Sequence, residues 1–357
     1  MPYTFNQKIS GLSPYDPIDG VYRIRLDANE SFLPIPDFMK DTLIQRLSNM
    51  DFNRYPDPCC TEVCKAFANY YSVNPALVTA GNGSDELISI IMQAFLMKGE
   101  KVLTVAPDFS MYHFYASLSE AKCITIPKEE DLSINVDSLI TSCITESARM
   151  IIFSNPCNPT SLGLKAQEVR RLIRCVNALV VLDEAYMDFW DQSLLQEVEQ
   201  YENLIILRTS SKAVGSAAIR LGFAVANPAL TRALRAVKSP YNVNAMTQAM
   251  GTCLFSHKEE LQKARDELLE SRNFLYKEIE TLAESYPGII RLFPTCTNFV
   301  YFQSSKAREL FDFFGEHGVA VRFMGDSLRI TAGTEEENRE VIRLLKEFLK
   351  RRGDSVA

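Results

Sequence analysis

Histidine is scarce in this chain: only His113, His257 and His317 occur among 357 residues. A histidine-centred catalytic triad or a histidine-rich metal site is therefore not expected, and a catalytic base has to be another kind of side chain. Long apolar runs are missing too. No stretch approaches the roughly 18 apolar residues of a membrane helix, and the opening MPYTFNQKIS lacks the apolar core of a signal peptide. These absences predict a cytoplasmic protein without a membrane partner.

Positive charge is in deficit, with 38 Lys and Arg against 45 Asp and Glu. A nucleic acid is not expected as a partner, because no basic stripe offsets the formal charge of −7. The nine cysteines are an odd number in a chain without a signal peptide, which favours free thiols. Their densest group, Cys59, Cys60 and Cys64, has no second Cys or His pair at zinc-like spacing. No metal is therefore expected.

The length is large for one hydrophobic core, so two domains are expected. Residues 1–36 are rich in proline and predict an arm that wraps a surface. A large domain is expected over 37–250 and a smaller C-terminal α+β domain over 251–357, packed with part of the arm. In the small domain the pattern predicts a long helix over about 257–285 and a final helix over 335–351.

Seven short apolar runs alternate with helix-like segments in the large domain. They cover residues 77–81, 101–107, 122–127, 150–156, 178–184, 203–209 and 222–228. The runs are continuous rather than alternating, as expected for strands covered on both faces. Several end in Pro, Asn, Asp or Ser, so polar side chains collect where the strands finish. Ligands bind at that edge in open α/β sheets.

Two of these strand ends carry motifs with more than one interpretation. AGNGSDELISIIMQAF (80–95) joins a strand to an apolar helix through glycines, Ser84 and Asp85. It predicts either a phosphate cradle at a helix N-terminus or an ordinary βα turn with an N-cap. SNPCNPT (154–160) holds two Asn-Pro steps. These either project the Asn side chains into a site or simply break the chain direction.

A third and a fourth strand end carry charge. Asp183 and Glu184 follow VVL, and such carboxylates either pair with a neighbouring Arg or stabilise a positive centre in a ligand. Lys212 lies in TSSKAVGSAAIR (209–220) between two buried runs, where a free ammonium is costly. Together these motifs suit the cofactor pyridoxal 5′-phosphate. The lysine can form a Schiff base with its aldehyde, the acid can hold its pyridinium N–H, and the Gly turn with Ser, Thr and Arg can bind its phosphate.

The chain resembles the fold-type I pyridoxal-phosphate aminotransferases, and among them most closely those that act on histidinol phosphate. The resemblance runs from about residue 12 to 350 and rests on eight motifs in order: LDANES, NRYPDP, GNGSDE, PDFSMY, NPCNPT, VVLDEAYMDF, LRTSSKAVGSAAIRLGF and LRITAGT. It implies a three-layer α/β/α large domain with a mostly parallel seven-stranded sheet, and a ping-pong transfer of an amino group between a small amine and a 2-oxo acid.

The resemblance also implies roles for individual residues. Lys212 would hold the cofactor as an internal aldimine and then act as the base, and Asp183 would keep the pyridine nitrogen protonated. Asn158 and Tyr186 would contact the phenolic oxygen, Tyr186 counting with Lys212 and Asp183 as catalytic, and Tyr112 would stack on the ring. The phosphate would be surrounded by Gly83, Ser84, Asp85, Thr209, Ser211 and Arg220. Tyr55 would reach the phosphate in the partner subunit, which implies a homodimer with shared active sites.

The substrate residues implied are Tyr15, Asn29, Arg322 and Arg329. Two arginines and a tyrosine suit a dianion such as a phosphate better than a lone carboxylate. The sequence departs from the family where NPTS replaces NPTG, where SAAIR replaces LAGLR, and where the MGD turn between the arginines is short. A threonine-phosphate decarboxylase, an aromatic or broad-range aminotransferase, and a non-enzymatic cofactor-binding regulator or scaffold remain alternatives.

Overall fold

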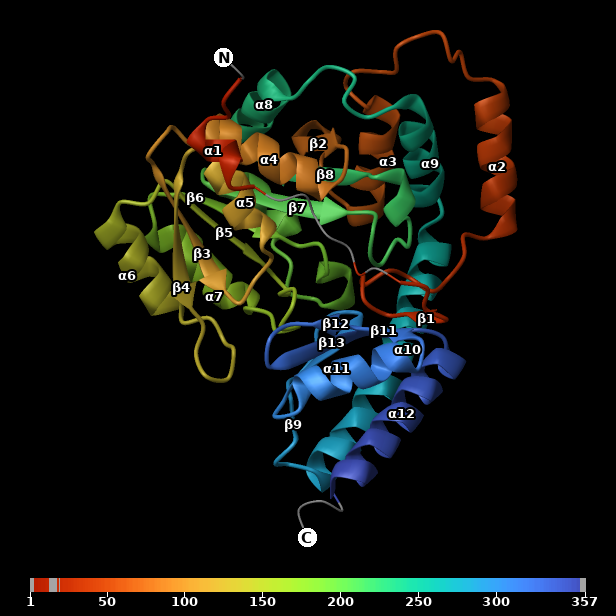
Figure 1. Ribbon diagram of the computed structural model, residues 1–357. Helices are drawn as coiled ribbons and strands as arrows, with labels where there is room; N and C mark the ends of the chain where they lie inside the picture. The colour runs from red at the N-terminus through yellow and green to blue at the C-terminus, as the bar shows by residue number, and fades with distance from the viewer. Residues whose placement is uncertain (1–2, 13–17, 19, 354–357) are drawn as a thin grey trace.

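The computed structural model describes residues 3–12, 18 and 20–353. Its centre is a seven-stranded sheet in the order β2-β8-β7-β6-β5-β3-β4, parallel except for β8. The strands are β2 (Val78–Gly81), β3 (Lys101–Ala106), β4 (Lys122–Pro127), β5 (Met150–Ser154), β6 (Leu179–Asp183), β7 (Leu204–Thr209) and β8 (Gly222–Ala226). All seven predicted strands and the mostly parallel sheet are confirmed (Figure 1).

Helices cover both faces of this sheet, which confirms the three-layer architecture. One face packs against α3 (Thr61–Tyr71), α6 (Val136–Glu146), α7 (Ala166–Cys175) and α9 (Ala245–Phe255). The other packs against α4 (Ser84–Phe95), α5 (Met111–Leu118) and α8 (Pro228–Val237). Successive residues of β6 point to opposite faces, as the period of a strand requires, so Val180 lies in the first core and Val181 in the second.

One strand differs from the expectation. The run 122–127 was expected to be covered on both faces, but β4 is the edge strand, and each of its residues is exposed or half-buried. The composition of a short apolar run does not reveal whether the strand lies at the edge of the sheet or has a neighbouring strand on both sides.

The small domain is built on an antiparallel sheet of order β12-β13-β10-β9. Its elements are α10 (Lys258–Ser285), β9 (Ile290–Leu292), β10 (Phe299–Ser304), α11 (Ala307–Glu316), β11 (Val319–Ala320), β12 (Arg322–Phe323), β13 (Ser327–Thr331) and α12 (Glu335–Gly353). Leu261 of α10 lies in the large-domain core and Leu275 in the small-domain core, so this helix links the two. The predicted boundary at 250/251 stays a prediction.

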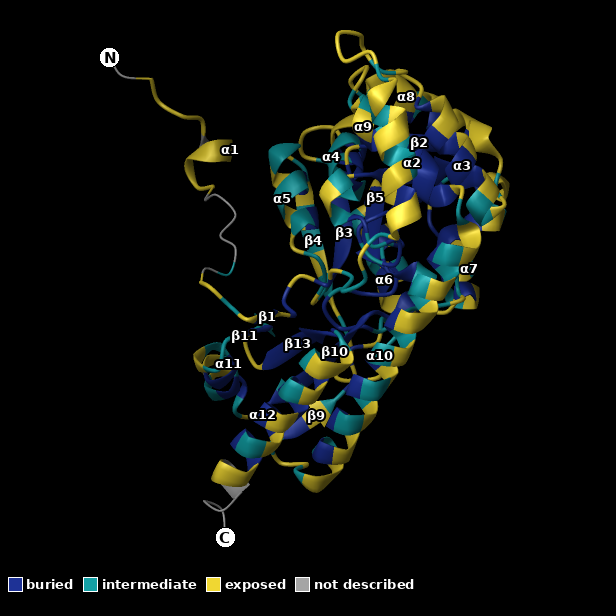
Figure 2. Ribbon diagram, turned by 90° about the vertical axis from the view of Figure 1, so that its right-hand side faces the viewer, coloured by how far each residue is buried: buried dark blue, intermediate teal, exposed yellow. Residues whose placement is uncertain are grey.

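The N-terminal segment is partly packed. It contains α1 (Gln7–Ser10), β1 (Ile24–Arg25) and α2 (Asp37–Ser48), and β1 pairs in parallel with β11. Ile24 and Leu26 are buried in the small-domain core. The residues around α1 are mostly exposed and lie at one side of the body (Figure 2). Short 3-10 turns complete the chain: η1 (Pro75–Leu77), η2 (Met187–Phe189), η3 (Leu195–Gln200) and η4 (Ala217–Ile219).

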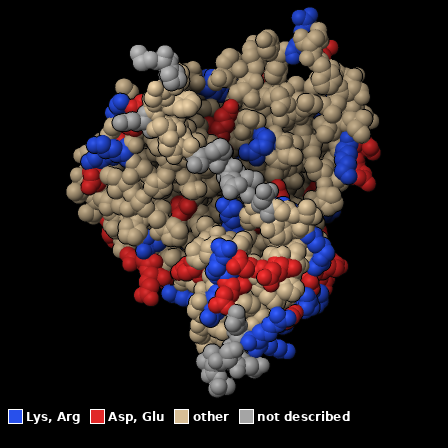
Figure 3. Space-filling model, viewed as in Figure 1, with Lys and Arg blue, Asp and Glu red and all other residues tan. Residues whose placement is uncertain are grey.

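Charged side chains of both signs are intermixed over the small domain on the face shown in Figure 3. Many form ion pairs within α12 or between it and its neighbours, such as Arg343 with Glu340 and Lys346 with Glu278. Among the residues that the structure describes, no helix combines the length and the apolar character that crossing a membrane requires.

Candidate active site

The register of the large sheet brings four of the predicted motifs to one end of the sheet, where the parallel strands have their carboxyl ends. We call this end the edge of the active site. Ser154 at the end of β5 is level with Asp183 at the end of β6. On the other side, Thr209 of β7 is level with Gly222 of β8, which is level in turn with Gly81 of β2. The motifs that follow β2, β5, β6 and β7 therefore start from one row of neighbouring positions. The small domain lies against this edge (Figure 1).

Lys212 is half-buried at this edge and has no carboxylate within ion-pair distance among the described residues. Its Nζ donates to the carbonyl of Ala28 at 2.9 Å and lies 5.7 Å from the centre of the Tyr186 ring. Burial, and then the positive charge of Arg329, lowers the pKa of Lys212 from 10.5 to about 8. A substantial fraction of the amine is therefore neutral near physiological pH, as a nucleophile or base requires.

Asp183 is buried, with 4% of its surface exposed, and has no cationic partner among the described side chains. Its carboxylate accepts hydrogen bonds from the Tyr112 hydroxyl at 2.9 Å and the Ala185 N–H at 3.2 Å. Burial raises the pKa of Asp183 from 3.8 to about 6, although the Tyr112 hydrogen bond opposes the shift. The carboxylate is poised to hold a positive group that the chain itself does not supply.

Glu184, the next residue, resolves the two interpretations of the acidic pair. Its side chain points away from the edge and forms a buried ion pair of 2.9 Å with Arg208. Arg208 also pairs with Asp188 at 2.9 Å. One carboxylate of the pair is thus structural, while the other is left without a cation.

The β2–α4 turn and β8 approach each other so closely that only glycine fits. A Cβ on Gly222 would come within 2.2 Å of the Ser84 nitrogen, and a Cβ on Gly83 within 2.9 Å of the Arg220 guanidinium. Gly83 has a φ of 86° and directly precedes α4. Arg220 ends η4 with a φ of 50°. The N-terminus of a helix and a guanidinium therefore meet at one point, which suits an anion.

Hydroxyl groups line the same corner. Thr209 donates to the Ser211 hydroxyl at 3.0 Å, and the Ser210 hydroxyl is buried without a partner among the described residues. Asp85 was expected to contribute mainly its backbone N–H. Its side chain accepts a 2.6 Å hydrogen bond from Tyr115, a residue that the sequence did not single out.

Asn158, Asn29, Tyr186 and Arg329 lie together where the two domains meet. The Asn158 side-chain oxygen accepts a hydrogen bond from Arg329, whose guanidinium also donates to the carbonyl of Asp27 and lies 5.4 Å from the Phe299 ring. Asn29 donates to the Tyr186 hydroxyl at 2.8 Å. Burial raises the pKa of Tyr186 to about 12, so its hydroxyl keeps its proton.

Arg322 is directly opposite Arg329 in the β12–β13 pair. Opposed like charges destabilise a sheet unless an anion lies between them. Arg322 has no acidic partner among the described residues. Two predicted residues lie outside this cluster. Tyr55 is exposed and stacks on Tyr241 with ring centres 4.6 Å apart, and Tyr15 lies outside the described residues.

The sequence profile of aminotransferase class I and II matches residues 23–345. The chain belongs to this family. The histidinol-phosphate aminotransferase of Clostridium novyi is 39% identical to this aminotransferase over 347 residues, 96% of each chain. That of Clostridium kluyveri is 38% identical over 351 residues, 97% of this chain and 99% of the relative. A crystal structure of the Sinorhizobium meliloti histidinol-phosphate aminotransferase in complex with pyridoxal-5′-phosphate superposes with a TM-score of 0.84. It is 23% identical and covers 96% of this chain and 98% of the other.

The position of Tyr112 bears on its expected role as the stacking residue of this aminotransferase, which stays a prediction. A residue that stacks on a cofactor must present a free ring face, but Tyr112 is fully buried in the second core. Its hydroxyl is instead bound to Asp183. Phe109, three residues earlier, is half-buried and packs edge-on against Tyr112 at 5.6 Å. The motif PDFSMY holds both aromatics, and only the fold distinguishes them.

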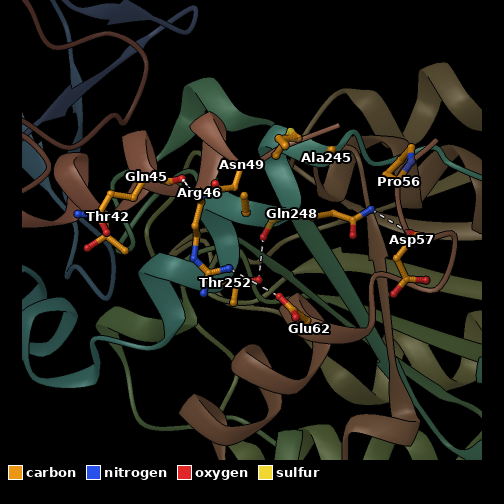
Figure 4. Close-up of a pocket in the computed structure, with 12 residues that line it drawn as sticks. Thr42, Gln45, Arg46, Asn49, Pro56, Asp57, Glu62, Ala245, Gln248 and Thr252 are labelled. Carbon is orange, nitrogen blue, oxygen red and sulfur yellow. Dashed lines mark hydrogen bonds and ion pairs between the residues drawn. The ribbon is translucent and has the colours of Figure 1, made fainter. Parts of the chain in front are cut away.

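A cavity of about 720 Å³ in this aminotransferase lies between α2, α3 and α9, and no predicted site residue lines it. Figure 4 shows Arg46 and Glu62 pointing toward each other there, and Gln248 bound to Asp57. The charged side chains of Arg46 and Glu62 in its lining are paired with each other. The strand edge, by contrast, combines unpaired charges with hydroxyl groups and is the better candidate for the chemistry.

Proposed function

We propose that this aminotransferase binds pyridoxal 5′-phosphate and transfers the amino group of histidinol phosphate to 2-oxoglutarate. The observation that carries the proposal is the arrangement of Lys212, Asp183 and Arg220 at one sheet edge, each without a charged partner in the described chain. One ligand with an aldehyde, a pyridine nitrogen and a phosphate would engage all three.

The residues fit this cofactor. The phosphate would lie at the start of α4 against the backbone N–H groups of Ser84 and Asp85, with Arg220, Thr209 and Ser211 around it. Gly83 and Gly222 allow the β2–α4 turn to approach β8 and Arg220 more closely than any Cβ would permit. The hydroxyl of Ser210 is a further donor that needs a partner. Asn158 and Tyr186 would face the phenolic oxygen, and we assign the aromatic face to Phe109 in place of Tyr112.

When bound, the cofactor supplies an aldehyde for the substrate amine and a ring that takes up electrons from the substrate α-carbon. Asp183 holds a proton at the pyridine nitrogen, because a buried carboxylate without a cation stabilises that positive charge strongly. Lys212 would serve as the base that removes the proton from the substrate α-carbon and delivers it to the cofactor. Its lowered pKa keeps the amine neutral enough for this task.

Arg322 and Arg329 support a doubly charged substrate. They face one another across two strands, and a phosphate between them would relieve their repulsion. Asn29 orients Tyr186 and joins the N-terminal segment to this region. The similar proteins named histidinol-phosphate aminotransferase take their name from a substrate that carries such a phosphate.

A homodimer belongs to the proposal. Tyr55 is 82% exposed, and as a partner-side contact it would lose that exposure against the phosphate corner of the second subunit. Tyr15 is proposed to reach the substrate phosphate in the same way. The protein is proposed to work in the cytoplasm, in histidine biosynthesis.

The test is a half-reaction panel with the purified holoenzyme. Histidinol phosphate, phosphothreonine, phenylalanine and glutamate are each added, and the loss of the visible band of the lysine-bound cofactor is followed. A fast response to histidinol phosphate and glutamate, with a slow one to phenylalanine, is expected. A fast response to phenylalanine with none to histidinol phosphate would favour an aromatic aminotransferase, and carbon dioxide release from phosphothreonine would favour the decarboxylase. A protein without a visible band would be a scaffold.

A further inference from the structure

Ser161 occupies a backbone conformation that favours glycine. Its φ is 63°. It lies three residues after Asn158, where the family that the chain resembles usually has the glycine of NPTG. A non-glycine residue in the left-handed region is strained and persists only where other contacts hold it. The departure from the family pattern therefore needs a compensating interaction.

That interaction is a cluster of three hydroxyl groups, which we call the hydroxyl clasp. The Ser161 hydroxyl lies 2.6 Å from the hydroxyl of Thr295 and 2.6 Å from that of Thr297. The backbone N–H of Cys296 donates to the Ser161 carbonyl at 3.0 Å. Ser161 and Thr297 are fully buried. Glycine could not make the side-chain part of this contact.

The small-domain side of the clasp is held rigidly. Arg272 of α10 donates to the carbonyls of Thr295 and Thr297 at 3.0 and 2.9 Å. The Thr295 hydroxyl donates to the carbonyl of Phe299 at 2.7 Å. Phe299 begins β10, and its ring lies under the guanidinium of Arg329. The partners of Ser161 are thus continuous with the segment that supports Arg329.

The Asn158 loop is therefore joined to the small domain at two points. Its first contact is the hydrogen bond between Asn158 and Arg329, and its second is the hydroxyl clasp. The loop is already anchored within the large domain, for example by the hydrogen bonds between Asn155 and Leu164. The two contacts with the small domain therefore fix the position of the loop relative to Arg329. The clasp lies outside the proposed cofactor and substrate contacts, so it acts on them only through position.

We propose that Ser161 is a positioning residue, which uses the hydroxyl clasp to fix Asn158 relative to Arg329 in the substrate-binding geometry. The inference rests on the proposed function, since it takes Asn158 and Arg329 as site residues. Arg329 binds the substrate anion before any bond changes. A less well-fixed Arg329 would bind the substrate more weakly in the ground state and in the transition state alike. KM therefore rises and kcat changes little.

The test compares Ser161→Ala and Ser161→Gly, which both remove the hydroxyl, whereas glycine alone also relieves the strained φ. Thr297→Val and Thr297→Ser form a second pair, of which the serine keeps the hydroxyl. Ser285→Ala removes an exposed hydroxyl on α10 and is the control. KM and kcat are measured with the donor of the panel that the wild-type holoenzyme uses. The unfolding free energy of Ser161→Ala, Thr297→Val and the double variant gives their coupling.

We expect KM for the donor to rise about 3- to 10-fold in both Ser161 variants and in Thr297→Val, which is the size expected for one lost hydrogen bond. The value of kcat should stay within about twofold of wild type. Thr297→Ser and Ser285→Ala should match wild type. The inference is overturned if Ser161→Gly has wild-type KM, which would leave only a backbone effect, or if the double variant shows no coupling. A wild-type enzyme that ignores histidinol phosphate would overturn the proposed substrate alone.

Discussion

Two groups of buried charges lie side by side at the ends of β6 and β7, and they differ in one respect. In the structural group, Arg208 forms ion pairs of 2.9 Å with both Glu184 and Asp188, and the Tyr71 hydroxyl donates to Asp188 at 2.9 Å. In the functional group, Asp183 and Lys212 have hydrogen bonds but no opposite charge. Asp183 and Glu184 are thus adjacent in the sequence, but Glu184 is paired with a cation and Asp183 is not.

The difference explains why one group suits chemistry and the other does not. Breaking a closed buried network leaves uncompensated charge, so its members are fixed by stability. Unpaired charges instead cost stability in the free chain and are relieved only by a ligand. The functional group shows this in its pKa values, since those of Asp183 and Lys212 are both shifted toward the neutral form by burial.

The comparison is tested most severely at Lys212. Lys212→Ala should lower kcat on the order of 10⁴-fold, because it removes both the attachment point and the base. Borohydride reduction of the loaded enzyme followed by mass spectrometry should find no cofactor on the chain. Covalent attachment elsewhere, or turnover close to wild type, would contradict the assignment. The exposed Lys263→Ala is the control and should keep both properties.

Arg208 should show the opposite behaviour, a loss of stability. Arg208→Met leaves the buried carboxylate of Glu184 and the half-buried carboxylate of Asp188 without their cation and should lower the free energy of unfolding by about 3–5 kcal/mol. Denaturant unfolding of the cofactor-free protein measures this. Arg170→Met, which breaks a partly exposed pair with Glu197, is the matched control with an expected loss of about 1 kcal/mol or less. Similar losses in the two variants would remove the distinction.

Asp183→Asn should instead stabilise the cofactor-free protein. The pKa of Asp183 is about 6 in the folded chain and 3.8 as the ordinary value. Between these values the folded chain binds more protons than the unfolded chain, so the carboxylate lowers stability as pH rises from about 4 to 6. Asparagine avoids this loss, so the variant should gain up to about 3 kcal/mol above pH 6 and nothing below pH 4.

Unfolding at pH 4 and pH 7.5 checks the sign of this effect, with the exposed Asp191→Asn as control. The same Asp183 variant should lose most of its transaminase activity, because a neutral amide cannot hold the pyridine proton. A variant that is active and no more stable at pH 7.5 would place Asp183 in the structural group.

Arg220→Met should weaken the affinity for pyridoxal 5′-phosphate about 10- to 100-fold, the range for lost hydrogen bonds to a charged group. Stability without cofactor should change little, because the one hydrogen bond of this guanidinium within the described part of the chain is a 3.2 Å bond to the Ala217 carbonyl. Equilibrium titration with the cofactor measures the affinity. Arg232→Met, on the exposed face of α8, should retain it. Equal affinity in both variants would exclude a phosphate contact at Arg220.

The sequence predicts the sheet and the residues at its edge well, for a physical reason. Apolar runs such as 178–182 are long enough to identify buried strands, and polar residues directly after a parallel strand must lie at its carboxyl end. Other features depend on contacts between distant segments. The edge position of β4 depends on which strand is its neighbour, and the clasp joins Ser161 to residues 134 and 136 positions away. No local pattern contains that information.

Tyr112 shows where a motif leaves a detail open, and its expected role as the stacking residue stays a prediction. PDFSMY holds two aromatics one helical turn apart, and the sequence does not say which faces the cofactor and which faces the core. In the structure, Tyr112 has no exposed surface and its hydroxyl donates to Asp183, which favours Phe109 as the residue that faces the cofactor. Tyr112 thus connects the functional group to the core as a hydrogen-bond donor.

Tyr112→Phe is the substitution with the smallest and most specific expected effect on the functional group. It keeps the ring but removes the hydrogen bond that lowers the pKa of Asp183, which should rise further by about one unit for a bond of about 1 kcal/mol. The pH at which the cofactor-free protein stops losing stability should move upward accordingly, while cofactor affinity stays close to wild type. Phe109→Leu should do the reverse, because it removes an aromatic face and leaves Asp183 untouched. If Tyr112→Phe leaves the pH dependence unchanged while Tyr112→Leu alone lowers affinity, Tyr112 is a stacking residue after all and Asp183 owes its shifted pKa to burial alone.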